Sequence, residues 1–176
     1  AIGLVGSEMC IRDRYIDQPV PIGFFVLFFI GSIIMRGAGC TWNDFLDKEY
    51  DKNVSRTKDR PLASNKIKTI NALVFLLVQL LIGLLILVQF NKLTIIIGSL
   101  ALIPVFIYPL MKRVTWWPQI FLGITFNWGA LLGWLSLSND FSSIYPILLY
   151  LACIFWTVGY DTIYAHQDKD LSLIHI

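Results

Sequence analysis

Two groups of acidic residues are the part of this sequence that could carry out chemistry. Asp44, Asp47 and Asp51 are spaced three and then four residues apart, so on a helix they would share one face. Asp161 and Asp168 form a second group, seven residues apart, and they would share a face in the same way. Ligands that offer only oxygen, without His or Cys, suit a hard cation, and Mg²⁺ above all. The spacing therefore indicates carboxylates that could hold Mg²⁺.

Basic residues accompany the acids and suggest what the metal would be bound to. Arg56 and Arg60 follow the first acidic group, and Lys112 and Arg113 end the segment "YPLMKR". Arginine recognises phosphate oxygens through paired hydrogen bonds, and lysine supplies a point charge. Mg²⁺ commonly lies between carboxylates and a substrate phosphate. Acids and bases together favour a diphosphate ligand more than either set does alone.

A simpler interpretation stays open from the spacing alone. Carboxylates at the C-terminal end of a helix oppose its dipole, and like charges one turn apart repel each other. A positive partner should offset both effects, and that partner could be a metal ion. It could equally be a nearby lysine such as Lys48 or Lys52, in which case the acids are solvated helix ends.

The elements that must position these residues are membrane spans. Only 15% of the 176 residues are charged, 56% are hydrophobic, and the mean hydropathy is +0.67, whereas soluble domains carry about 25% charge. Five stretches contain no Asp, Glu, Lys or Arg, and each is about as long as the ~17–25 residues that a spanning helix needs: 18–35, 69–91, 93–111, 114–139 and 141–160. The sequence predicts an all-α, multi-span transmembrane helix bundle and excludes a soluble domain.

The basic residues also predict the orientation of the bundle. Seven of the 14 lie between positions 44 and 68, and two more lie in the link at 111–117. Loops rich in Lys and Arg remain on the cytoplasmic side, so we expect both links to face the cytoplasm, or the matrix in a mitochondrion. The first and last spans then run in the same direction. The acids at 44–51 and at 161–170 should therefore lie at the same face of a bacterial or mitochondrial inner membrane.

The two ends of the chain do not match this pattern. Residues 1–14 and 171–176 have no evident relation to the rest and look like translated adapter sequence. We expect them to be foreign, so that residues 15–170 would be part of a domain that belongs to a longer protein.

The two acidic segments resemble the signatures of a known family, the UbiA superfamily of intramembrane prenyltransferases. The segment "GAGCTWNDFLDKEYDKNVSRTKDRPLAS" is similar to the first signature, which falls on Asn43, Asp44, Asp47, Asp51, Arg56 and Arg60. The segment "YDTIYAHQDKD" is similar to the second, which falls on Asp161, Tyr164, Ala165 and Asp168. The last acid of that signature would fall on Ser172, which departs from it. The resemblance covers residues 20 to 170.

The resemblance implies a fold and an activity. The fold would be a nine-helix ring around a lipid-open cavity, to which this chain would contribute about five helices. The activity would be Mg²⁺-dependent transfer of a polyprenyl group from its diphosphate to 4-hydroxybenzoate in ubiquinone synthesis. Relatives that prenylate other aromatic or quinone precursors, and a transporter-like membrane protein, remain alternatives. Neither a nucleic acid nor a protein partner is expected.

Roles for individual residues follow from the same resemblance. Mg²⁺ would be held by the five acids, Asp44, Asp47, Asp51, Asp161 and Asp168. Tyr164 would face the allylic cation through a cation–π contact. Asn43 and Asn127 could bind substrate or could bridge helices by hydrogen bonds. The diphosphate would contact Arg56, Arg60, Lys112 and Arg113.

Overall fold

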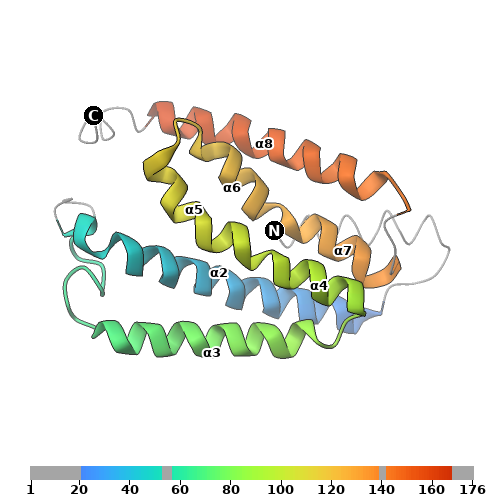
Figure 1. Cartoon of the computed structure of the whole chain (residues 1–176), viewed down its shortest axis with the longest axis horizontal. Helices are drawn as coiled ribbons and strands as arrows, with labels where there is room; N and C mark the ends of the chain where they lie inside the picture. The colour runs from blue at the N-terminus through green and yellow to red at the C-terminus, as the bar shows by residue number, and fades with distance from the viewer. Residues whose placement is uncertain (1–20, 53–56, 139–141, 168–176) are drawn as a thin grey trace.

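A computed structural model describes residues 21–52, 57–138 and 142–167, and this part of the chain consists of helices and short connections (Figure 1). The terminal segments 1–14 and 171–176 lie outside the described residues. The helices are α2 (Ile22–Asp51), α3 (Thr69–Leu87), α4 (Lys92–Leu100), α5 (Leu102–Val114), α6 (Pro118–Phe126), α7 (Trp128–Ser138) and α8 (Tyr145–Gln167).

The five expected spans are confirmed, but the first helix continues well past residue 35, to Asp51. Helical segments long and apolar enough to cross a membrane run over Ile22–Asp51, Thr69–Leu87, Lys92–Met111, Pro118–Ser138 and Tyr145–Ala165. Large apolar side chains stand on their outer surfaces, such as Phe155 and Trp156 at 74% and 76% exposure. Such a surface is stable where lipid, rather than water, surrounds it.

Two of the spans are broken helices. One breaks between α4 and α5, where Pro104 has no N–H to donate to the carbonyl of Leu100 one turn earlier. The other breaks between α6 and α7 at Asn127, whose φ of −93° and ψ of 5° leave the helical range. The apolar stretches in the sequence are continuous at both places, so hydropathy alone does not reveal the breaks.

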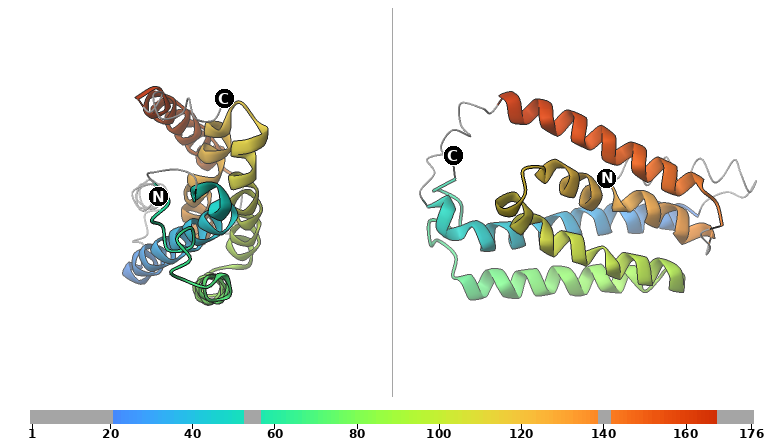
Figure 2. Two further views of the ribbon diagram at one scale, coloured as in Figure 1. Left: turned by 90° about the vertical axis from the view of Figure 1, so that its left-hand side faces the viewer. Right: turned by 45° about the horizontal axis from the view of Figure 1, so that its top comes forward.

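The helices pack in an arc rather than in a closed bundle. Helix α2 packs against α3 and α5, α5 packs against α6, and α6 and α7 pack against α8; the end-on view in Figure 2 shows this curved arrangement. Two tryptophan side chains tie neighbouring spans together. Trp42 Nε1 donates to the carbonyl of Phe106 at 3.2 Å, and Trp128 Nε1 donates to that of Ile97 at 3.0 Å.

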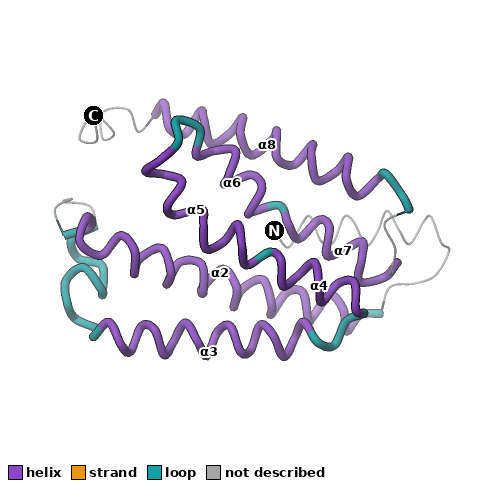
Figure 3. The backbone as a smooth tube through the Cα atoms, viewed as in Figure 1, coloured by secondary structure: helices purple, strands orange, loops and turns teal. Residues whose placement is uncertain are grey.

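The C-terminal ends of α2, α5 and α8 lie at the same end of the molecule, on the left in Figure 1. The connections 57–68 and 115–117 lie at this end too, whereas 88–91 and 142–144 lie at the opposite end (Figure 3). The arrangement agrees with the predicted alternation of the spans. It also brings the ends of α2 and α8, which carry the first acidic group and Asp161, to one face.

Candidate metal and diphosphate site

The first acidic group belongs to α2 itself and does not follow it. This helix has 30 residues, which corresponds to about 45 Å at 1.5 Å per residue, whereas the hydrocarbon core of a bilayer is about 30 Å thick. Helix α2 is therefore longer than the hydrocarbon core is thick. Its last turns carry Asp44, Asp47 and Asp51 on a rigid element, at the end where the helix dipole disfavours negative charge.

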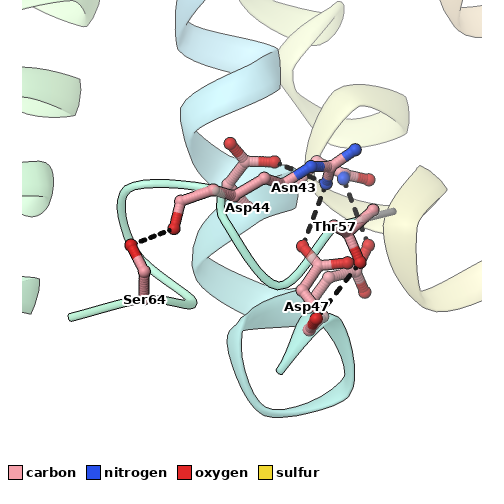
Figure 4. A network of polar contacts seen from close by, with 7 residues as sticks. Asn43, Asp44, Asp47, Thr57 and Ser64 are labelled. Carbon is pink, nitrogen blue, oxygen red and sulfur yellow. Dashed lines mark hydrogen bonds and ion pairs between the residues drawn. The ribbon is translucent and has the colours of Figure 1, made fainter. Parts of the chain in front are cut away.

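Arg60 supplies the positive charge that offsets this group. Its Nη1 atom lies 2.9 Å from Asp44 Oδ1 and 2.9 Å from Asp51 Oδ2, so one nitrogen joins two carboxylates. The side chain of Asp51 is only 12% exposed, so its charge depends on this partner. Figure 4 shows the surrounding contacts. Thr57 Oγ1 donates to the backbone carbonyl of Asp51 at 3.2 Å, and Ser64 Oγ donates to that of Arg60 at 2.8 Å.

The loop that carries Arg60 is folded back against the helices. Leu62 and Ala63 are buried at 6% and 4% exposure, and they anchor the loop beyond Arg60. Asn65 has a φ of 55°, in the left-handed region that Asn tolerates better than most residues. This local structure holds the guanidinium of Arg60 at the end of α2.

The lysines that could have neutralised the acids make other contacts. Lys52 Nζ lies 2.8 Å from Glu49 Oε1, and Lys48 Nζ donates to Thr69 Oγ1 at 3.1 Å. The positive partner seen at Asp44 and Asp51 is thus the arginine that the family resemblance assigns to the diphosphate. Asn43 Nδ2 donates to Asp47 Oδ2 at 3.1 Å, so Asn43 orients a carboxylate one turn further along α2 (Figure 4).

Asp161 is the residue of the second acidic group that the structure describes, and it shares an electrostatic neighbour in α5 with Asp47 of the first group. Asp161 in α8 is half-buried. Tyr108 of α5, also half-buried, interacts electrostatically with both Asp161 and Asp47. Sequence reasoning did not single out Tyr108. The available signal was its position one helical turn before Lys112 in "YPLMKR".

Apart from Asn127, the remaining predicted residues divide into three sets. Tyr164 is 64% exposed, and its ring meets that of Tyr160 edge-on with centroids 6.3 Å apart. Lys112 and Arg113 belong to the last turn of α5, at the end of the molecule that carries the acids. Arg56 and Asp168 lie outside the described residues.

Asn127 makes its contacts inside the bundle. It is only 2% exposed, and its Nδ2 donates to the carbonyls of Gly123 at 2.8 Å and Cys153 at 3.1 Å, and to Thr157 Oγ1 at 2.8 Å. Of the two roles that the sequence leaves open for Asn127, these contacts are those of a bridge between α6 and α8.

The donor chemistry of the site fits Mg²⁺, although the acids are not gathered around one point. Within the described residues, no three His, Cys, Asp or Glu side chains come together as a metal site. Asp44 and Asp51 nevertheless converge on a single positive nitrogen. Carboxylate oxygens are the ligands that Mg²⁺ prefers, so the type of donor at this site suits a hard cation.

Comparison with known proteins identifies the family. The sequence pattern of the UbiA prenyltransferase family matches residues 9–171. The chain belongs to this family. The match includes both acidic segments, so the UbiA relationship predicted from those segments is confirmed.

Several curated UbiA relatives of this chain carry the same protein name. The chain is 55% identical over 143 residues to "4-hydroxybenzoate polyprenyltransferase, mitochondrial" of Drosophila melanogaster, a match that covers 81% of this chain and 36% of the relative. The proteins of the same name from Bos taurus and Homo sapiens are 47% and 46% identical over 169 residues, which is 96% of this chain and 43% of each relative. The chain spans about two fifths of the length of these relatives.

A solved structure confirms the fold. The apo structure of a UbiA homolog from Aeropyrum pernix K1 superimposes with a TM-score of 0.78 at 23% identity, covering 97% of this chain and 63% of that one. The all-helical transmembrane fold predicted from the sequence is therefore that of a UbiA protein.

Proposed function

We propose that this chain is part of an enzyme that transfers a polyprenyl group from polyprenyl diphosphate to 4-hydroxybenzoate in ubiquinone synthesis. The observation that carries the proposal is the ion-paired cluster of Asp44, Asp51 and Arg60, which lies at the same end of a UbiA fold as the C-terminal end of α8, the helix that contains Asp161. Identities of 46–55% to curated 4-hydroxybenzoate polyprenyltransferases support this choice of substrates.

The reaction breaks the allylic C–O bond, and the bonding electrons leave with the diphosphate. A ring carbon beside the hydroxyl-bearing carbon of 4-hydroxybenzoate forms the new C–C bond, and the ring then loses a proton. Bound Mg²⁺ would neutralise the charge that develops on the diphosphate. Its ligands would be the five acids, Asp44, Asp47, Asp51, Asp161 and Asp168.

The other site residues would bind and orient the substrates. Charge-assisted hydrogen bonds to the phosphate oxygens would come from Arg56, Arg60, Lys112 and Arg113. Asn43 would hold Asp47 in its orientation through their 3.1 Å hydrogen bond. The exposed ring of Tyr164 offers an electron-rich face to the allylic cation. The bilayer would deliver the polyprenyl chain along the apolar spans and exclude water from the cation.

The protein is an integral membrane protein with five candidate spans in the described residues. The relatives named above are mitochondrial. We place the acidic end on the cytoplasmic or matrix side of a bacterial or mitochondrial inner membrane, because the basic links lie at that end.

A transfer assay tests this function. The protein is expressed at the full length of its gene in membranes that lack the activity, and it is supplied with 4-hydroxybenzoate and a polyprenyl diphosphate. We expect the 3-prenylated acid to form only with Mg²⁺. Asp44→Asn and Asp161→Asn should each abolish it, whereas Glu49→Gln, which removes an exposed acid of the same helix end, should not. Undiminished transfer by either Asp variant would overturn the site. If another aromatic or quinone precursor is prenylated in preference to 4-hydroxybenzoate when both are supplied, only the proposed acceptor changes.

A further inference from the structure

One nitrogen atom of Arg60 occupies the place between two of the proposed metal ligands. Its Nη1 lies 2.9 Å from both Asp44 and Asp51. A Mg²⁺ ion bound to these carboxylates would lie about 2.0–2.1 Å from their oxygens. The guanidinium and the ion would then be in close contact, and two positive charges at such a distance repel strongly. Metal bound to the same two oxygens, Asp44 Oδ1 and Asp51 Oδ2, therefore requires Arg60 to leave at least one of them.

The cost of this exchange depends on what arrives with the metal. If the metal arrives alone, Arg60 loses two charge-assisted hydrogen bonds and gains no new acceptor. If it arrives with a diphosphate, the phosphate oxygens offer Arg60 acceptors at least as good as those it loses. The side chain of Arg60 is 40% exposed, so it can turn toward a ligand at the surface of the site without unpacking the buried residues Leu62 and Ala63.

We propose that Arg60 is an internal counter-ion that occupies the metal position between Asp44 and Asp51 until a diphosphate arrives. The site then takes up the divalent cation together with the prenyl diphosphate, and it resists the free cation. This inference rests on the proposed function, since it uses the same acids as metal ligands. It adds a coupling between metal and substrate that is built into the 57–64 turn.

Direct metal binding tests the coupling without any measurement of turnover. The full-length protein is reconstituted in nanodiscs, and Mn²⁺ is used as a paramagnetic probe, with and without a prenyl thiodiphosphate in which the C–O bond is replaced by a less reactive C–S bond. We expect Arg60→Gln to bind Mn²⁺ alone about tenfold more tightly than the wild type, the size expected from losing a competing charged hydrogen bond. The analogue should tighten Mn²⁺ binding in the wild type and much less in Arg60→Gln.

A matched variant separates competition from a general loss of positive charge. Lys52→Gln removes one positive charge from the same end of α2, but Lys52 pairs with Glu49 and not with the proposed ligands. Its affinity for Mn²⁺ alone should remain within about twofold of the wild type, as for an exposed ion pair. Equal affinities for Mn²⁺ in wild type, Arg60→Gln and Lys52→Gln would overturn the inference. Equal gains in both variants would also overturn it.

Hydrogen exchange provides a second test. It uses only the wild-type protein, so its result does not depend on whether a variant folds. Saturating Mn²⁺ alone should speed amide exchange in residues 57–64, because Arg60 no longer ties the turn to α2, and adding the analogue should slow it again. Unchanged exchange on metal binding would overturn the inference. If the protein transfers prenyl groups but Arg60 does not compete with the metal, only this inference is refuted. If Arg60 competes with the metal but no prenyl group is transferred, only the proposed function is refuted.

Discussion

Asn127 donates a 2.8 Å hydrogen bond to Thr157 Oγ1, and both side chains are almost completely buried, at 2% and 1% exposure. The bond joins the break between α6 and α7 to α8, one helical turn before Asp161. Thr157 Oγ1 in turn donates to the carbonyl of Cys153 at 2.9 Å. This pair therefore helps to fix the axial position of α8 relative to α6, and with it the position of Asp161.

We predict that Asn127→Leu destabilises the protein by about 1–2 kcal/mol, the range for buried interhelical hydrogen bonds in membranes. Leucine has a similar size but cannot donate to Thr157 or Cys153. The free energy of unfolding is measured by titration with SDS in mixed micelles. Asn71→Leu, at an exposed position of α3, is the control and should change the free energy by less than about 0.5 kcal/mol. Equal stability of the two variants would show that the Asn127 bridge contributes nothing.

Close packing at Gly123 leads to a second prediction. A Cβ atom built there would lie 3.2 Å from the backbone oxygen of Ile154 and 3.4 Å from its Cα, so α8 would have to shift. We expect Gly123→Ala to lower the free energy of unfolding by about 1–3 kcal/mol, as overpacking usually does. Gly39→Ala provides the matched control, because nothing lies within 4 Å of its Cβ position and alanine favours a helix. A loss of stability in the control as large as that in Gly123→Ala would contradict the packing explanation.

The sequence predicts the spans well because lipid imposes a simple requirement. Each crossing needs about 20 apolar residues, and charged residues mark where the crossings end. It also predicts that Asp44, Asp51 and Arg60 belong to one site. It does not reveal the breaks at Ala101 and Asn127, because a broken span is as apolar as a continuous one, and only Pro104 marks the first break.

The contacts within the site were less accessible to sequence reasoning. Spacing along a helix shows which acids share a face, but it cannot show that Arg60 folds back onto Asp44 and Asp51. The turn that makes this contact depends on tertiary packing of Leu62 and Ala63. Tyr108 was missed for a related reason. Its electrostatic proximity to Asp47 and Asp161 depends on how α5 packs against α2 and α6, which spacing along the sequence does not define.

Removing the hydroxyl of Tyr108 tests that position. Tyr108 interacts electrostatically with Asp47 and Asp161, so the loss of its polar atom should disturb both acidic groups. We predict that Tyr108→Phe lowers the rate of prenyl transfer, because it removes the polar group that lies within electrostatic range of both Asp47 and Asp161. The rate is measured at saturating substrates across a range of Mg²⁺ concentrations. The control is Tyr145→Phe, which alters an exposed tyrosine at the end of α8 opposite to Asp161 and should have no effect. Wild-type rates in both variants would rule out a role for Tyr108.

The orientation of the protein in the membrane can be tested by labelling single cysteines. Lys58 and Gln89 are both exposed and lie in connections at opposite ends of the molecule. In a protein from which the other cysteines have been removed, Lys58→Cys should react with a membrane-impermeant maleimide only from the cytoplasmic or matrix side. Gln89→Cys should react only from the other side, because the α3 span separates the two positions. The physical reason is that the basic residues around Lys58 resist translocation, whereas the 88–91 link carries no charge. Labelling of Lys58→Cys from the outer side of sealed vesicles would reverse the topology and move the acidic site to the opposite face. Labelling of both positions from one side would contradict the span formed by α3.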